Sequence, residues 1–281
     1  MAKFKSFFKT VDSRKYNTWC AWTNRLDTYG CGCAHDCQYC YAKALLNFRG
    51  LWNPQSPSVA DVEDIEKKLR KLPQGTVVRL GGMTDCFQPI ELTERVTYET
   101  IKLLNKYGIE YLIVTKSHIV ATDEYMQILD KDLAHIQITV TTTDDDLCAI
   151  YEKASPPSMR IKAIEKLQEN GFDVSVRLSP FIPEFIRVDE INAIKCDKIL
   201  IEFLKVNTWV KKWFDIDYSP YTLKYGGYYH LPLDQKIALV NLITGYREVT
   251  VGEYVKDHYE YFRDNVNYNR DDCCNLRRTK K

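Results

Sequence analysis

Between residues 76 and 204, short apolar runs alternate with longer segments in which apolar residues recur at helical spacing. The apolar runs are rich in Val, Ile and Thr and almost continuous in apolarity, which is typical of parallel strands covered by helices. They comprise residues 76–82, 110–116, 135–143, 173–180 and 198–204. We place one more strand near residues 25–29, just before a group of cysteines. The pattern therefore predicts an α/β fold with a largely parallel sheet.

The segments between these runs have the spacing of amphipathic helices and cover residues 92–108, 122–133 and 156–171. The first and third of them end at Gly108 and Gly171, the residue type that adopts the left-handed C′ position at little cost. The repeat amounts to about six β/α units, fewer than the eight of a closed barrel. We therefore predict a partial (β/α)6 TIM-type barrel with its site at the carboxyl ends of the strands.

The β/α rhythm stops after Leu204, so we predict a barrel domain over residues 1–205 and a C-terminal cap region over residues 206–281. The cap is rich in aromatic residues and lysines between residues 209 and 230, followed by one amphipathic segment at 233–245. It ends in the short basic tail "NLRRTKK". Aromatic rings interleaved with lysines suit stacking on bases and pairing with phosphates. They also suit a cap that packs its aromatic rings on the barrel.

Composition narrows the classes of protein. With 281 residues and 45% hydrophobic content, the chain can bury the core of one large domain or two small ones. A net charge of +1 provides no global field toward DNA or an anionic membrane, so any contact with nucleic acid is local. No signal peptide and no membrane-spanning segment is predicted, and we expect a cytoplasmic protein with no membrane partner. Ten cysteines in such a protein favour metal binding or redox chemistry over disulfides.

Four of the cysteines lie in "CGCAHDCQYC", residues 31–40. Cys33, Cys37 and Cys40 have the spacing C-x3-C-x2-C, which allows a loop to wrap three thiolates around a cubane cluster and leaves the fourth iron open. Cys31 falls outside this triplet. The alternative is a zinc site completed by His35, which would make the chain a zinc-stabilised binding module without catalysis.

At these residues the sequence resembles the radical S-adenosylmethionine (SAM) superfamily, whose signature has an aromatic residue before the last cysteine, here Tyr39. The resemblance implies a [4Fe–4S] cluster on Cys33, Cys37 and Cys40, with SAM chelated at the open iron. It also implies reductive cleavage of SAM to a 5′-deoxyadenosyl radical that abstracts hydrogen from a substrate. An electron donor such as flavodoxin or ferredoxin would be a partner.

Further blocks resemble the spore photoproduct lyase-like branch over residues 27–183, among them "GGMTDCFQPIEL", "VTKS" and "VRLSPFIP". The resemblance implies cofactor contacts at Tyr39, Gly81, Gly82, Thr84, Asp85, Lys116 and Thr141. A glycine pair allows the main chain to approach a ligand closely, and a lysine at a strand end supplies charge for a carboxylate. Arg177, in an otherwise apolar strand, needs a buried anion, for which the cofactor carboxylate or a ribose hydroxyl is a candidate.

The chain departs from the lyase at one position. The cysteine that donates a hydrogen atom in the lyase is replaced here by Gly82. The candidates for catalytic roles are then Tyr41, which with Tyr39 flanks the last cluster cysteine, and the thiols of Cys86, Cys273 and Cys274. We expect a radical SAM enzyme that acts on a nucleic acid or nucleotide. The alternative is one that modifies a peptide or protein side chain.

Overall fold

The computed structural model describes residues 5–9 and 20–276. Residues 277–281, which carry the positive charges of the predicted basic tail, lie outside this part of the chain. No helix in the described part is long and apolar enough to cross a bilayer.

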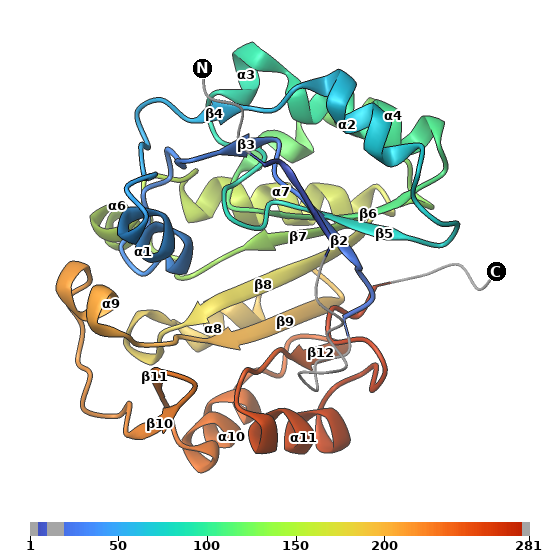
Figure 1. The fold of residues 1–281 in the computed structure, drawn as a ribbon. Coiled ribbons are helices and arrows are strands. Elements are labelled where there is room, and N and C mark those ends of the chain that lie inside the picture. Colours follow the sequence, from blue (N-terminus) through green and yellow to red (C-terminus); the bar gives the residue numbers. More distant parts are fainter. Residues whose placement is uncertain (1–4, 10–19, 277–281) are drawn as a thin grey trace.

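One open sheet of eight strands forms the centre of the molecule (Figure 1). Its first strand, β1, pairs antiparallel with β2, and the other neighbours are all parallel. In spatial order the strands are β1 (Phe7–Lys9), β2 (Asn24–Leu26), β5 (Val77–Leu80), β6 (Glu110–Thr115), β7 (Ala134–Thr139), β8 (Asp173–Phe181), β9 (Lys198–Phe203) and β12 (Glu248–Val251). The predicted partial barrel is thereby confirmed.

Helices connect the parallel strands, and short elements extend the connections. Along the chain the helices are α1 (Tyr41–Phe48), α2 (Val62–Leu69), α3 (Glu91–Glu94), α4 (Val96–Lys106), α5 (Asp123–Ile128), α6 (Asp145–Tyr151), α7 (Pro157–Glu169), α8 (Val188–Asn192), α9 (Thr208–Trp213), α10 (Leu233–Asn241) and α11 (Lys256–Asn265). Two small antiparallel sheets pair β3 (Tyr29–Gly30) with β4 (Ser58–Val59) and β10 (Leu223–Tyr225) with β11 (Tyr228–His230). Figure 1 shows α1, α6 and α9 together at the arrowhead ends of the strands.

The structure differs from the sequence prediction in two places. The segment 92–108 is divided because Arg95 adopts a left-handed conformation with φ of 58°, which separates α3 from α4. The sheet also has a seventh parallel strand, β12, beyond the six predicted units. This strand has only four residues and follows the aromatic-rich stretch, so the periodicity that marks the earlier units is absent there. The chain after residue 205 therefore returns to the central sheet.

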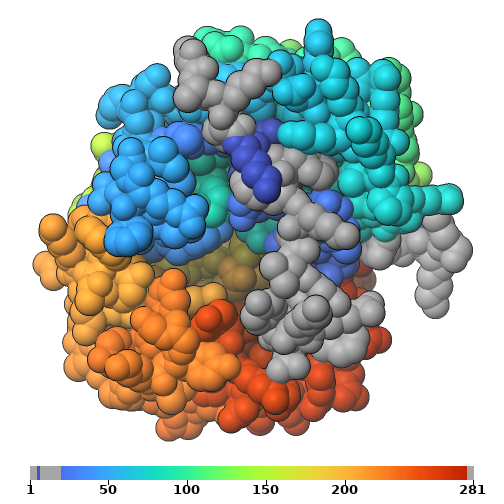
Figure 2. All heavy atoms as spheres, viewed as in Figure 1, coloured from blue at the N-terminus to red at the C-terminus, as the bar shows by residue number. Residues whose placement is uncertain are grey.

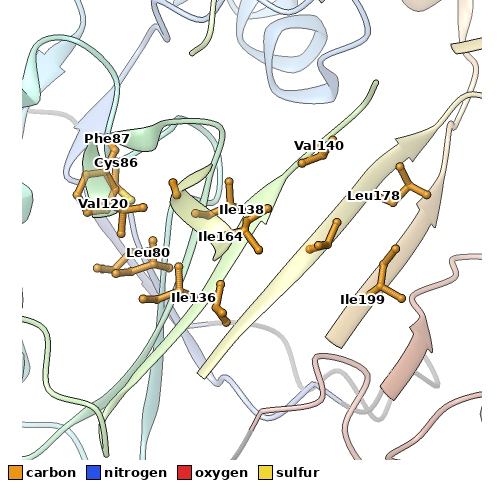
Figure 3. Packing of buried hydrophobic residues seen from close by; sticks show 14 of the residues in the cluster. Leu80, Cys86, Phe87, Val120, Ile136, Ile138, Val140, Ile164, Leu178 and Ile199 are labelled. Atoms are coloured by element: carbon orange, nitrogen blue, oxygen red, sulfur yellow. The ribbon is translucent and has the colours of Figure 1, made fainter. Parts of the chain in front are cut away.

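Helix ends and packing follow from the sequence. Gly108 and Gly171 have φ of +60° and +77°, as expected for left-handed residues that end α4 and α7. Apolar side chains of the helices pack on the strands, as Ile164 of α7 does near Ile136 and Ile138 of β7 (Figure 3). Each of these isoleucines is at most 1% exposed, and burying such a side chain contributes about 1.5–3 kcal/mol. Burial of apolar surface thus attaches α7 to the sheet.

Buried charges lie at the opposite, amino-terminal ends of the strands. His135 Nδ1 is 2.6 Å from Asp173 Oδ2 and its Nε2 is 3.5 Å from Glu110 Oε2. Lys198 Nζ lies 2.8 Å from the other oxygen of Asp173. Burial by itself lowers the pKa of His135, but the hydrogen bonds and charges of the two carboxylates outweigh it, so the pKa is raised.

This raised pKa predicts a pH-dependent contribution to stability. The contribution is fully present below the ordinary histidine pKa of about 6.5 and is lost as the pH rises through the raised value. The free energy of unfolding should therefore fall more steeply between pH 6 and 8 in the native protein than in a His135→Asn variant. Urea unfolding at a series of pH values measures both slopes. Parallel slopes would show that His135 is not charged in the folded protein.

Candidate cofactor site at the carboxyl ends of the strands

A cavity opens at the carboxyl ends of β5, β6, β7, β8 and β9. Its wall includes Cys33, His35, Cys37, Cys40, Tyr41, Arg79, Gly81, Gly82, Thr84, Asp85, Lys116, Arg177, Ser179 and Glu202. The space-filling view shows a hollow in the middle of the face, between blue N-terminal segments and orange C-terminal ones (Figure 2). The cavity thus lies at the end of the barrel that the sequence predicted for the site.

All three cysteines of the C-x3-C-x2-C motif line this cavity. Cys33 and Cys37 are buried, and Cys40 is partly exposed immediately before α1. His35, the residue of the zinc alternative, is buried in the same loop with Nδ1 3.4 Å from Asp85 Oδ2. The loop therefore brings three sulfurs to one cavity and directs its histidine toward a carboxylate.

The glycine pair after β5 places main chain at the cavity wall. Gly81 has φ of +79°, and a Cβ there would lie 2.5 Å from the carbonyl oxygen of Val114. A Cβ on Gly82 would lie 1.7 Å from Cδ of Arg25. Both Gly82 N and Met83 N donate to Asp27 Oδ1, each at 2.8 Å. A side chain at either position would displace these neighbours, so glycine is required at both places in the cavity wall.

Asp85 and Thr84 line the cavity but use their polar atoms within the protein. Asp85 accepts hydrogen bonds from Phe87 N at 2.8 Å, Thr115 Oγ1 at 2.7 Å and Lys116 N at 2.7 Å. Burial alone would raise its pKa, but His35 and the backbone donors lower it to about 2. The Thr84 hydroxyl donates to the carbonyl of Tyr29. The structure thus makes Asp85 a link between the cysteine loop and the end of β6.

Lys116, at the end of β6, lines the same cavity. Its Nζ lies 5.6 Å from the ring centre of Tyr39, and no carboxylate in the described part of the chain is within ion-pair distance of it. A lysine ammonium at a cavity wall without a carboxylate partner is suited to bind an anionic group of a ligand.

A buried network that the sequence analysis missed lies beside the cysteine loop, centred on Glu152. Its carboxylate pairs with Arg160 Nη2 at 2.5 Å, and both side chains are 0% exposed. It also accepts hydrogen bonds from Tyr39, Thr141 and, at 3.6 Å, from the Sγ of Cys37. Two residues for which the resemblance implied cofactor contacts, Tyr39 and Thr141, therefore belong to this network and are not among the residues that line the cavity.

The anion beside Arg177 comes from the protein itself. Arg177 donates to Glu202 of β9 and to Gln137 of β7. Burial would raise the pKa of Glu202, but Arg177 and a hydrogen bond of 2.7 Å from Ser179 outweigh it and lower the pKa to about 2. Arg177 lines the cavity, but it has no need of the cofactor as an anion, which corrects the sequence argument. The sequence shows Glu202 as the one acidic residue in the apolar run "KILIEFL", but it does not indicate that Arg177 lies beside it.

Of the four candidates for catalytic roles, Tyr41 alone is among the residues that line the cavity. Its hydroxyl donates to the carbonyl of Gly82. Cys86 is 1% exposed and packs beside Phe87 and Val120 in the hydrophobic core (Figure 3). Cys273 and Cys274 are buried against Val77 of β5 and Leu112 of β6 and are not among the residues that line the cavity. The described geometry thus brings no additional thiol to the cavity wall beside the motif cysteines.

Comparisons with known proteins agree with this geometry. A family model described as the radical SAM superfamily matches residues 28–191. An uncharacterized protein of Methanocaldococcus jannaschii is 29% identical over 164 residues, which cover 57% of this chain and 61% of that relative. The chain thus matches about three fifths of the relative's length.

Two solved structures share the fold. A variant of spore photoproduct lyase with bound AdoMet and dinucleoside spore photoproduct has a TM-score of 0.61 at 15% identity, covering 82% of this chain and 75% of that one. SuiB of Streptococcus suis bound to S-adenosylmethionine has a TM-score of 0.54 at 16% identity, covering 91% of this chain and 58% of that one. At these identities the likeness concerns the fold.

Proposed function

Because the chain belongs to the radical SAM superfamily, we propose that it is an enzyme whose Cys33, Cys37 and Cys40 hold the [4Fe–4S] cluster at which SAM is cleaved. The cofactors of this superfamily are a [4Fe–4S] cluster and SAM, as the resemblance at the cysteine motif led us to expect. The observation that carries the proposal is that the three motif cysteines, the glycine pair and Lys116 all line one cavity.

The residues of the cavity fit these cofactors. Three thiolates from one loop leave one iron of a cubane without a protein ligand. The Lys116 ammonium at the cavity wall can pair with a carboxylate, and Gly81 and Gly82 place main chain at the same wall. When bound, the reduced cluster supplies the electron that converts SAM to methionine and a 5′-deoxyadenosyl radical, which abstracts hydrogen from the substrate.

Two carboxylates, Asp85 in the cavity wall and Asp27 beside the glycine turn, keep these groups in position. Asp85 connects His35 of the cysteine loop with the backbone of Lys116. Asp27 holds the glycine turn through two backbone N–H groups. Because these carboxylates are already saturated by protein donors, their role is to orient the loop rather than to exchange protons with a ligand.

For the substrate we favour a nucleic acid or nucleotide, on the strength of the surface of α9. Lys211 Nζ lies 5.4 Å from the ring centre of Tyr218 and 5.0 Å from that of Tyr229. The ring centres of Trp209 and Trp213 lie 5.3 Å apart on the same helix. Lysines beside partly exposed rings can contact phosphates and bases together. The dinucleoside bound by the structurally similar lyase supports the same class of substrate.

The packing of the cap region limits which of its aromatic rings can contact a substrate. Phe214 and Tyr221 are buried at 3% and 5% exposure, so these two pack against the core. Tyr225 and Tyr229 are 40% and 39% exposed. The helix α9 itself contacts α1, which directly follows the last motif cysteine. The exposed rings and lysines therefore extend from the neighbourhood of the cysteine loop.

We expect single-stranded DNA or RNA to bind with an affinity that falls steeply with salt. A Lys211→Ala/Lys212→Ala variant should bind more weakly, with the slope of log affinity against log salt reduced by about 1.4, since each of the two phosphate contacts contributes about 0.7. A Lys67→Ala/Lys102→Ala variant on α2 and α4 removes the same charge elsewhere and should retain the native slope. Fluorescence anisotropy at two salt concentrations measures this. Absence of binding to both nucleic acids would favour a peptide or protein substrate.

A further inference from the structure

Three cysteines far apart in the sequence meet at a second place in the fold. In the described part of the chain, Cys20, Cys273 and Cys274 form the one group of three or more potential metal ligands whose ligand atoms all lie within 4.8 Å of one another. The Sγ atoms of Cys20 and Cys273 are 2.8 Å apart, and those of Cys273 and Cys274 are 4.0 Å apart. We call these three residues the second thiol site. Its two adjacent cysteines, Cys273 and Cys274, are buried at 8% and 6% exposure.

The second thiol site lies against the central sheet, beneath the wall of the cofactor cavity. It packs with Val77 of β5 and Leu112 of β6, and also with Val114, which lines the cavity. The carbonyl of Cys274 accepts a hydrogen bond of 3.2 Å from Gln137, whose side chain bonds to Arg177 of the cavity wall. A single layer of side chains thus separates the second thiol site from the cavity.

Asp272 joins the two segments that carry the three thiols. Its Oδ1 accepts hydrogen bonds from Ala21 N at 3.3 Å and from Cys274 N at 2.9 Å, and its Oδ2 accepts one from Leu276 N at 3.0 Å. These bonds hold the backbone next to Cys20 against the backbone of the vicinal pair. The arrangement resembles the outer shell that orients the ligands of a metal site.

We propose that Cys20, Cys273 and Cys274 bind one thiophilic metal ion, Zn²⁺, which joins the segment near residue 20 and the segment near residue 273 beneath the cofactor cavity. This site is independent of the proposed function, because none of its ligands belongs to the C-x3-C-x2-C motif.

Ligand chemistry and spacing favour a single ion. Thiolates without accompanying carboxylates select soft or borderline ions, among which Zn²⁺ is bound structurally in a tetrahedron. With Zn–S bonds of about 2.3 Å, tetrahedral sulfurs stand about 3.8 Å apart. The observed sulfur separations of 2.8 and 4.0 Å lie on either side of that value. In a cubane each thiolate binds a different iron, which requires a wider spacing than three sulfurs around one ion.

Nearby charges and the number of sulfurs at the site support the same assignment. Arg79 and Arg177 attract the thiolates of Cys20 and Cys274, and their two charges oppose the negative charge of Asp272 and of a buried trithiolate centre. A disulfide between Cys20 and Cys273 would use two of the three sulfurs and leave Cys274 without a role. Three protein thiolates leave one tetrahedral position for a ligand from outside this group.

Metal analysis of the full chain, purified without oxygen, tests the proposal. We expect one zinc ion per chain in addition to the iron of the cluster. Cys20→Ser and Cys273→Ser should each lose the zinc and retain the iron. Cys37→Ser should lose the iron and retain the zinc. Cys196→Ser is the matched control, since this buried cysteine contacts the carbonyl groups of Val174 and Lys198, and it should retain both metals.

X-ray absorption at the zinc edge of the native protein gives a test that does not depend on any variant folding. Three sulfur neighbours at about 2.3 Å are expected. A sulfur-poor shell, the absence of zinc, or zinc that survives in Cys20→Ser would overturn the proposal. Loss of iron from Cys20→Ser would indicate that the second thiol site holds an iron–sulfur cluster, and it would also overturn the zinc proposal. A Cys20–Cys273 disulfide, found by mass spectrometry after alkylation without oxygen, would also overturn it.

Discussion

Replacing Cys37 by alanine is expected to reduce the formation of 5′-deoxyadenosine from SAM to background. Cys37 is 8% exposed and lines the cavity with the two other motif cysteines. Its loss leaves two thiolates from the loop, too few to hold a cubane with one open iron. The measurement is chromatographic quantification of 5′-deoxyadenosine after anaerobic reconstitution with iron and sulfide and reduction by dithionite.

Cys31 offers a matched control within the same loop. It lies outside the triplet and is not among the residues that line the cavity. Its φ is 56°, and alanine meets the same backbone cost there as cysteine does, so Cys31→Ala should leave the loop intact. We expect this variant to retain the iron content and the cleavage activity. Activity that survives in Cys37→Ala but disappears in Cys31→Ala would contradict the assignment of the ligands.

The second large effect is expected from Arg160→Met, which should lower the free energy of unfolding by about 3–5 kcal/mol. The substitution removes the cation that pairs at 2.5 Å with the Glu152 carboxylate, which is 0% exposed. It also removes the donor to the carbonyl of Thr139, 3.0 Å away. Urea unfolding near neutral pH, analysed for the midpoint and the slope, measures the loss.

The way in which the free energy of unfolding changes at acid pH gives a second test of the buried pair. Burial by itself raises the pKa of Glu152, but the charges of Arg160 and Lys116, with hydrogen bonds, lower it to about 2. The contribution of Glu152 is therefore present above the ordinary glutamate pKa of about 4.3 and is lost as the pH falls toward 2. In Arg160→Met this pKa should rise, so acidification should cost the variant less stability than it costs the native protein.

Two controls separate the ion pair from general packing. The double variant Arg160→Met/Glu152→Gln removes both charges and should recover part of the lost stability, because no buried charge remains unpaired. Arg187→Met removes an arginine that is 57% exposed and pairs with Asp144, and it should cost less than about 1 kcal/mol. If Arg160→Met lowered the free energy of unfolding no more than Arg187→Met does, the buried Arg160–Glu152 pair would not stabilise the fold as we expect.

The features that the sequence allowed us to predict are those encoded within short segments. Apolar runs mark β5 to β9 because these segments are rich in Val, Ile, Leu and Thr. Gly108 and Gly171 mark helix ends because the left-handed conformation favours glycine. The cysteine loop is recognisable because three ligands of one cluster lie within eight residues. Each of these features depends on residues that lie close together in the sequence.

The remaining features depend on contacts between distant segments. Arg177 indicated that a buried anion was needed, but only the register of β8 against β9 identifies it as Glu202. Tyr39 is adjacent to a motif cysteine, yet its hydroxyl donates a hydrogen bond to Glu152. That residue follows α6 and is more than a hundred residues away in the sequence. The second thiol site required the segments around Cys20 and Cys273 to be brought together by the fold. Spacing within the sequence contains no signal for such encounters.

The central claim is that the loop from Cys33 to Cys40 holds a cubane whose open iron binds SAM. Electron paramagnetic resonance of the reconstituted, dithionite-reduced protein, recorded with and without SAM, tests it most directly. The account predicts the signal of a reduced [4Fe–4S] cluster, with g values that shift when SAM is added. A protein that forms no such cluster, or a cluster signal that SAM leaves unchanged, would contradict it.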